Sequence, residues 1–346
     1  ILNECFDLLF KIYVEEGYSR RNAIEDILSK NLLGIDLDTR AKQLAMFALM
    51  MKACQKEQSF LDAKVMPRVY NMPRPIAEMI PSDWSTKDAT EFLHGTVPHY
   101  MLGSNDKMTK EISDAVLLMN HADTLGSIMK FDISEETRNA IMIRTQEYEQ
   151  LLANGEIVPE AIQLLIPYMH IILALTDRYA AICMNPPYMG SGRFDSVLSK
   201  YVKDNYEEGK ADLFSVFMLL AIDRLLPNGK YGMINMQSWM FLSSFEKLRT
   251  RLLTENRIDN MLHLGPRTFD ELSGEVVQNT AFVITNCEGK DATGAYYRLV
   301  DGKNCGDKER MFLEARENDG NRIYYPNVSQ HDFEKIPGAP IGYWVS

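Results

Sequence analysis

The chain has 346 residues, of which 46% are hydrophobic and 25% are charged. These values are ordinary for globular domains, so the composition excludes a disordered, collagenous or fibrous protein, and the length predicts roughly two domains. Thirty-seven basic residues against 48 acidic ones give a formal net charge of −11. This charge disfavours a protein whose whole surface binds nucleic-acid phosphates, although it leaves room for a local basic groove.

The five cysteines lie far apart, without a C-x-x-C pair or the spacing of metal ligands. Their distribution favours a reducing compartment and gives no support to a metal site or a disulfide framework. The longest apolar run, residues 161–175, is interrupted by Gln163, Pro167 and His170 and is too short to span a bilayer. No signal peptide is recognisable. We therefore expect a cytoplasmic protein that has no membrane partner and no metal.

The chain begins at Ile1, within an apolar helical pattern that ends near Glu16. Because the last residues also read like an internal stretch, we interpret the sequence as a piece of a longer polypeptide. A short buried strand is expected over 32–38, and Asp38 is well placed to cap a helix over 40–54. Helix, strand and helix in this order indicate an α/β architecture. The apolar face of the second helix is expected to comprise Ala41, Leu44, Ala45, Ala48 and Met51.

Residues 57–176 are expected to form a mainly helical insertion, because a stretch this long cannot be a loop. Asp132 and Glu135 resemble a capping pair at the start of one helix, and Pro159 opens another. No internal repeat or low-complexity segment interrupts the region.

Alternating helices and strands are expected from residue 177 onward, as in a parallel sheet. The expected elements are a strand over 180–184, a helix over 212–226, a strand over 230–236, a helix over 244–256 and a strand over 258–264. Two further apolar runs, 280–285 and 295–299, predict an antiparallel pair at a sheet edge.

The tetrapeptide Asn185-Pro186-Pro187-Tyr188 ends the first strand of this region. Two prolines lack the N–H groups that a central strand needs, so they make a rigid turn at its carboxyl end, where open α/β sheets bind ligands. Asn185 Oδ1 and a proline carbonyl can accept hydrogen bonds from an exocyclic amino group, and Tyr188 offers a flat face for a heteroaromatic ring. The alternative is a strand-ending turn with an incidental aromatic residue.

Asn-Pro-Pro-Tyr at this place resembles the catalytic motif of adenine-N6 DNA methyltransferases that use S-adenosylmethionine. More narrowly, the whole chain resembles the large adenine-specific methyltransferases of BREX and phage-growth-limitation (PglX-like) defence systems. The resemblance is carried by residues 34–41, 179–190, 210–214, 336–338 and 343–344. It implies methyl transfer to N6 of adenine in double-stranded DNA, within a restriction or phage-defence system that includes other proteins.

The resemblance also implies a fold: a Rossmann-like class I methyltransferase sheet, mostly parallel with an antiparallel edge hairpin, interrupted by a large helical insertion. The family's Gly-rich first motif does not occur before Asp36. We therefore expect the first strand and Gly loop to be absent and the chain alone to bind cofactor poorly. The expected division is 1–56 for the N-terminal part of the methyltransferase core, 57–176 for the insertion, 177–300 for the catalytic core, and 301–346 for a linker or the start of a target-recognition domain.

Three residues would bind S-adenosylmethionine by this resemblance. Asp36 matches the acidic residue that accepts hydrogen bonds from the cofactor's ribose hydroxyls. Asp123 resembles the residue that binds the amino group of the cofactor's adenine, although a solvated turn explains it equally well. Phe217 matches the aromatic residue that lies against that adenine, but it also falls on the apolar face of its helix, where core packing is at least as good an interpretation.

The target adenine, flipped out of the duplex, would lie between Tyr188 and Phe269 by the same resemblance. Asn185 and a carbonyl of Pro186 or Pro187 would accept both hydrogens of its amino group. No metal is implied in this chemistry.

Two other functions remain open. A protein-glutamine methyltransferase uses the same tetrapeptide to hold a side-chain amide, but the long separation between Asp36 and Asn185 and the presence of Phe269 disfavour it. The third interpretation is a non-catalytic DNA-binding scaffold of a defence complex, which the intact tetrapeptide disfavours.

Overall fold

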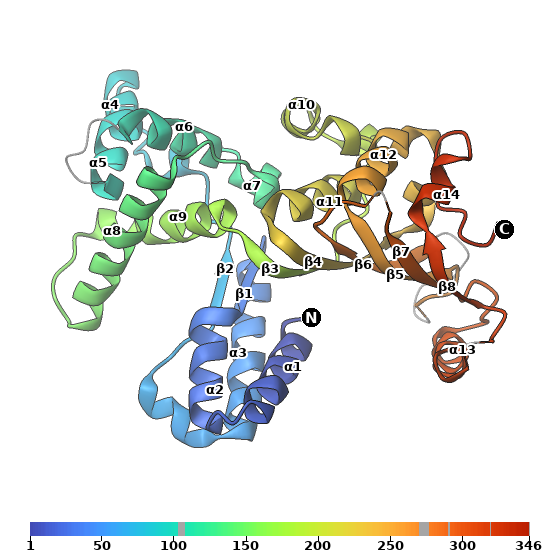
Figure 1. Ribbon diagram of the computed structural model, residues 1–346. Helices are drawn as coiled ribbons and strands as arrows, with labels where there is room; N and C mark the ends of the chain where they lie inside the picture. The colour runs from blue at the N-terminus through green and yellow to red at the C-terminus, as the bar shows by residue number, and fades with distance from the viewer. Residues whose placement is uncertain (103–107, 270–276, 290, 319, 346) are drawn as a thin grey trace. The chain divides into compact units, whose positions relative to one another are not determined.

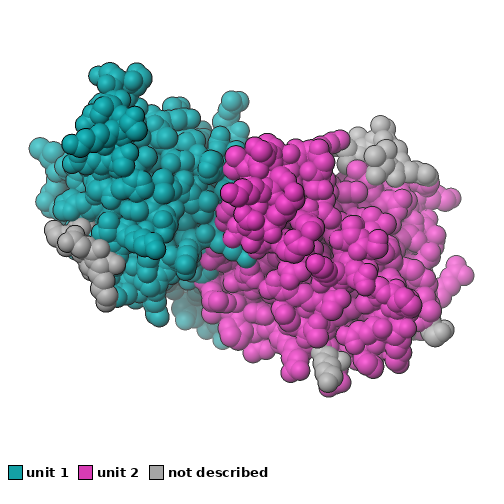
Figure 2. Space-filling view, turned by 90° about the horizontal axis from the view of Figure 1, so that it is seen from above, with its two compact units in different colours: residues 1–177 teal, residues 178–346 magenta. Residues whose placement is uncertain are grey.

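The structure is a computed structural model that describes residues 1–102, 108–269, 277–289, 291–318 and 320–345 (Figure 1). The chain divides into two compact units, unit 1 over residues 1–177 and unit 2 over residues 178–346 (Figure 2). Among the described residues, no helix is both long enough and apolar enough to cross a membrane.

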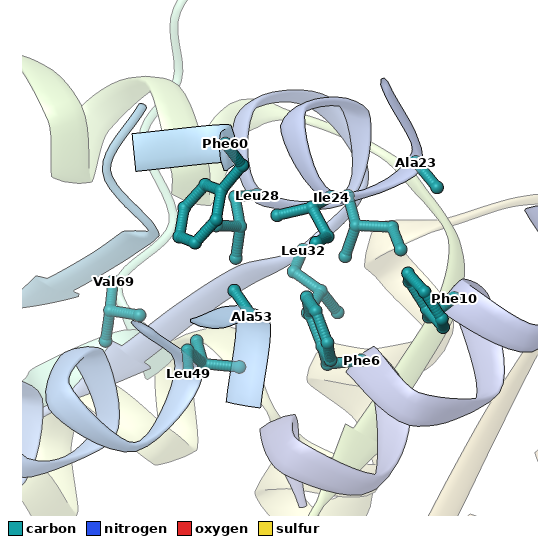
Figure 3. Close-up of a cluster of buried hydrophobic side chains, with 11 residues drawn as sticks. Phe6, Phe10, Ala23, Ile24, Leu28, Leu32, Leu49, Ala53, Phe60 and Val69 are labelled. Atoms are coloured by element: carbon teal, nitrogen blue, oxygen red, sulfur yellow. The ribbon is translucent and has the colours of Figure 1, made fainter. Parts of the chain in front are cut away.

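The first part of unit 1 is a two-stranded parallel sheet with three helices around it. Its elements are α1 (Leu2–Glu15), α2 (Arg20–Asp26), β1 (Leu33–Asp36), α3 (Thr39–Lys56) and β2 (Arg68–Asn71). Apolar side chains from all three helices and from β2 meet in one buried cluster, among them Phe6, Ile24, Leu49 and Val69 (Figure 3). The sequence analysis missed β2, because four residues are too few for a periodic pattern.

The buried face of α3 differs from the expected one. Leu49 and Ala53 are buried, whereas Leu44 and Met51, which the helical spacing assigned to the apolar face, are exposed. Apolar residues occur around the whole circumference of this helix. The helical period of 3.6 residues therefore does not indicate which face of α3 is buried. Packing against the buried cluster determines that face.

The rest of unit 1 is helical. It contains α4 (Thr86–Glu91), α5 (Val97–Leu102), α6 (Thr109–Met119), α7 (Ala122–Leu125), α8 (Glu135–Ala153) and α9 (Glu160–Thr176). The residue that caps α8 is Ser134, whose Oγ accepts a hydrogen bond from Thr137 N at 3.3 Å, and not Asp132, which lies two residues too early. The helix α9 packs beside β2, where His170 stacks on Tyr70 with ring centroids 4.6 Å apart.

Unit 2 contains a six-stranded sheet. Its strands are β3 (Tyr179–Met184), β4 (Leu225–Met236), β5 (Arg257–Gly265), β6 (Asn279–Thr285), β7 (Thr293–Arg298) and β8 (Tyr324–Ser329), in the order β3-β4-β6-β5-β7-β8. Its helices are α10 (Ser196–Asn205), α11 (Leu213–Arg224), α12 (Glu246–Glu255), α13 (Cys305–Glu317) and α14 (Gln330–Glu334). The strands β3, β4, β5 and β7 share one direction, and β6 and β8 oppose them. The expected mixed α/β fold with a mostly parallel sheet is confirmed, and α11 and α12 lie on one face of it (Figure 1).

The expected antiparallel edge pair of 280–285 with 295–299 is wrong. The strand β6 lies inside the sheet, antiparallel to both β4 and β5, and β7 pairs in parallel with β5. Because β4 and β5 pair with the two edges of β6, β6 has no free edge for β7, although β7 follows β6 directly in the chain. Residues 301–346, predicted as a linker or the start of another domain, contain α13, β8 and α14 and belong to unit 2.

Candidate active site

The Asn185–Tyr188 tetrapeptide leaves the carboxyl end of β3, as predicted. Asn185 and Pro187 are exposed, Pro186 is buried and Tyr188 is half-buried. The Asn185 carboxamide makes no hydrogen bond to any residue that the structure describes. The turn thus presents a free carboxamide at the sheet edge where open α/β folds bind ligands.

Asp212 fixes the segment that follows the tetrapeptide. One of its carboxylate oxygens, Oδ1, accepts hydrogen bonds from Met189 N at 3.1 Å and from Phe214 N at 3.2 Å, so that it caps α11 and holds the loop together. Leu213 N donates to Met189 O at 2.9 Å alongside. Burial raises the pKa of the Asp212 carboxyl, and the backbone donors oppose that rise. The sequence analysis did not place Asp212 at the site; its position one residue before a helix was the available signal.

Tyr188 is held through both its hydroxyl and its ring. Asn279 Nδ2 donates to Tyr188 Oη at 3.1 Å, and the hydroxyl in turn donates to Ile234 O at 3.4 Å. The ring meets Phe214 edge-on, with centroids 6.4 Å apart and planes at 90°. Burial raises the pKa of the Tyr188 hydroxyl, which is therefore neutral at physiological pH.

Phe269 is 40% exposed and follows the end of β5. The loop leaves the strand at Gly265, whose φ of 66° is left-handed and whose position leaves no room for a side chain, because a Cβ would lie 2.9 Å from Val300 Cγ1. Thr268 Oγ1 closes the turn by donating to Gly265 O at 3.0 Å. Phe217 is half-buried on α11, between fully buried neighbours. The stacking role of Phe269 and the cofactor role of Phe217 stay predictions.

Asp36 is the last residue of β1 and is exposed. Its Oδ1 accepts a hydrogen bond from Asp38 N at 2.9 Å. Asp38 caps α3, as predicted, by accepting from Arg40 N at 2.6 Å. Asp38 thus serves as the helix cap, whereas Asp36 ends the strand with an exposed carboxylate.

Asp123 lies exposed on α7, in the segment 122–126. That segment packs beside the residue after Asp36, since a Cβ built on Gly126 would lie 3.9 Å from Leu37 Cδ1. Leu37 itself is 58% exposed. Unit 1 thus brings Asp36 and Asp123 into adjacent segments, while unit 2 carries the tetrapeptide, Phe217 and Phe269.

A separate cleft of about 430 Å³ lies in unit 1 and contains none of the predicted site residues. Tyr70, Arg74, Tyr168 and His170 are among the residues that line it. Within the described ranges, no group of three His, Cys, Asp or Glu side chains is arranged to hold a metal ion.

Residues 30–269 match the model of the Eco57I restriction-modification methylase family. The chain is 36% identical over 350 residues to the adenine-specific methyltransferase PglX of Lacticaseibacillus casei (strain Zhang), and 35% identical over 361 residues to the adenine-specific methyltransferase BrxX of Escherichia coli O9:H4 (strain HS). Both alignments cover 100% of this chain and 28% of the relative.

Solved structures give weaker likenesses. The DrdV–DNA complex matches with a TM-score of 0.42 and 12% identity over 84% of this chain and 23% of that one. The methyltransferase subunit of a type I restriction-modification system from Streptococcus thermophilus matches with a TM-score of 0.37 and 13% identity over 99% of this chain and 94% of that one.

Proposed function

Because the chain belongs to the Eco57I restriction-modification methylase family, we propose that the whole protein methylates N6 of adenine in double-stranded DNA with S-adenosylmethionine. It acts in the cytoplasm, in a restriction or phage-defence system with other proteins as partners. The chain spans 28% of the length of the two curated relatives, PglX and BrxX. The observation that carries the proposal is the Asn185–Tyr188 turn, with its free carboxamide beside a fixed aromatic ring.

Asn185 provides the first acceptor for the target amino group. Its Oδ1 and a carbonyl of the Pro186-Pro187 turn accept the two amino hydrogens, which draws the nitrogen lone pair out of conjugation with the ring. With the lone pair so directed, N6 would accept the methyl group that bound S-adenosylmethionine would supply, the electrons of the methyl–sulfur bond would stay on the sulfur, and the surplus proton would leave the nitrogen afterwards. No strong base is needed, because the amine becomes acidic only once it is alkylated, so positioning and electrostatics supply the catalysis.

Tyr188 and Phe269 supply the stacking surfaces for the flipped base. Extruding an adenine from the duplex costs a few kcal/mol, and stacking on aromatic side chains returns about 1–3 kcal/mol per base. Phe269 is exposed, and the residues that follow it in the chain, 270–276, lie outside the described residues.

The residues of unit 1 fit the adenosine part of the cofactor. Asp36 offers a carboxylate to the ribose hydroxyls, Leu37 offers exposed apolar surface to the adenine ring, and Asp123 lies in the adjacent segment with a carboxylate for the amino group. Apolar surface flanked by a few convergent polar groups is the usual lining of such a site. When bound, S-adenosylmethionine supplies the methyl group on a positively charged sulfur. In unit 2, the half-buried Phe217 is the candidate for the aromatic side chain that lies against the adenine of the cofactor.

The test is methyl transfer by the full-length protein from labelled S-adenosylmethionine to unmethylated bacterial DNA, with a pool of bacterial proteins as the competing acceptor. The DNA is digested and its nucleosides are separated. We expect label in N6-methyladenosine, abolished by Asn185→Ala and unchanged by Asn205→Ala, an exposed asparagine on α10. Label found in glutamine of the proteins, or cofactor binding without transfer to DNA or protein, would contradict the proposal.

A further inference from the structure

Asn279 is a fully buried asparagine whose side chain reaches the active-site tyrosine. It opens β6, and its Nδ2 lies 3.1 Å from Tyr188 Oη and 3.3 Å from Asn235 O. Asn235 is equally buried and is itself held, because its Oδ1 accepts from Trp239 Nε1 at 3.1 Å. Asn279 therefore connects the Tyr188 hydroxyl to the buried backbone of Asn235.

The carbonyl of Asn235 determines which way the Asn279 carboxamide points. If Asn279 Oδ1 and Nδ2 were exchanged, two acceptor oxygens would face each other, so Nδ2 must be the atom that reaches Tyr188. Asn279 Oδ1 is then buried without a hydrogen-bond partner among the described residues. A buried polar atom left unpaired is costly. The Asn279 carboxamide therefore keeps its bond to Tyr188 at a cost in folding stability.

The strand register places Asn279 between the end of β4 and the start of the loop that leads to Phe269. It lies opposite Met236 on β4 and opposite Gly265 on β5. Gly265 begins the loop that leads to Phe269, and Tyr188 is the residue that Asn279 holds. A shift of Asn279 would therefore change the position of the Tyr188 ring relative to the start of the Phe269 loop.

We propose that Asn279 is a positioning residue for base methylation: by donating to the Tyr188 hydroxyl, it fixes the ring on which the target adenine stacks. This inference rests on the proposed function. The hydroxyl bond and the edge contact with Phe214 hold the ring at two separate places, so the ring plane is fixed before DNA binds. Preorganisation of this kind is expressed in the rate of the chemical step more than in DNA binding.

The test compares Asn279→Leu, Tyr188→Phe and the double variant in the full-length protein, with Asn256→Leu as the matched control. Asn256 is also fully buried, has no side-chain hydrogen bond among the described residues, and lies at the opposite end of β5. We expect Asn279→Leu and Tyr188→Phe each to lower kcat about tenfold with KM for DNA changed less than about threefold, and the double variant to lose no more than either one. Asn256→Leu should leave both constants unchanged.

A second readout does not depend on which molecule is methylated. Hydrogen exchange of the backbone amides of residues 188–190 should accelerate in Asn279→Leu and Tyr188→Phe but not in Asn256→Leu. Losses that multiply in the double variant, or a loss in Asn279→Leu matched by Asn256→Leu, would overturn the inference. If the unmodified protein methylates no adenine, the proposed function fails, while the exchange data still decide whether Asn279 holds Tyr188.

Discussion

At the scale of single residues, Asp212 shows how one carboxylate organises a site. It caps α11 and also binds the backbone of Met189, 23 residues away in sequence. Helix capping by itself needs only the bond to Phe214 N. The additional bond to Met189 N fixes the loop immediately after the Asn185–Tyr188 turn, so the helix cap and this loop have a common support.

Asp212→Ala is expected to lower stability by about 1–2 kcal/mol through the lost cap, and to lower methyl transfer at least tenfold through the released loop. Asp212→Asn keeps an acceptor oxygen and should retain most of both properties. The control is Asp195→Ala, since Asp195 caps α10 by accepting from Leu198 N at 2.8 Å and does not bind the loop that follows the Asn185–Tyr188 turn. Denaturation and transfer assays separate the effects; equal activity losses in the two alanine variants would contradict this role.

His263 is a buried histidine that the structure keeps neutral. Its Nε2–H donates to Gln237 Oε1 at 2.7 Å, and Tyr343 O–H donates to its Nδ1 at 2.9 Å. Burial, together with the charges of Arg298 and Lys308, lowers its pKa from 6.5 to about 4. Since the unfolded chain then binds more protons between these two values, this contribution to stability falls as the pH falls through that range.

The loss of stability from His263 is expected to be about 2 kcal/mol between pH 7 and pH 5. His263→Gln removes the titrating ring and should flatten this part of the pH dependence, even if it lowers stability at pH 7. His331→Gln is the control, because His331 is an exposed residue of α14. Urea denaturation at the two pH values measures both. If His263→Gln left the pH dependence of stability unchanged, the conclusion that a neutral, buried His263 causes it would be refuted.

At the scale of elements, α12 fixes the segment near residues 336–345 through one side chain. Arg249 is 1% exposed and donates to the carbonyls of Trp239, Leu242, Gly338 and Ala339 at 2.6–3.1 Å. A planar guanidinium with five donors can satisfy carbonyls in several directions at once. These bonds attach the turn at Gly338 and Ala339 to the segment 239–242 that follows β4.

Arg249→Met is expected to destabilise the protein by about 3 kcal/mol or more, because it leaves several buried carbonyls without donors. Hydrogen exchange should also accelerate in residues 336–345. Arg251→Met, on the same helix, removes a partly exposed arginine that pairs with Glu255 and Asp223, and should cost about 1 kcal/mol or less. Thermal unfolding measures the loss of stability in each of the two variants. Similar losses would contradict a special role for Arg249.

At the scale of the whole molecule, the features that could be predicted from the sequence are those that short patterns of residues encode. The strand that ends in Asn185-Pro-Pro-Tyr188 and the cap at Asp38 are local signals, and the structure has both. Asn279 carries no such signal, because its partner Tyr188 is 91 residues away. The place of β6 was missed for a related reason: pairing across the sheet depends on residues that no window of the sequence contains together.

By the function proposed above, the Asn185–Tyr188 turn is the site of adenine methylation. The most direct measurement is the modification of genomic DNA in cells that carry the full-length gene, read as N6-methyladenine by single-molecule sequencing. Our account predicts methylation at one recurring sequence in cells with the natural protein and none in cells with Asn185→Ala, at equal protein levels. Methylation that persists in Asn185→Ala would contradict the account.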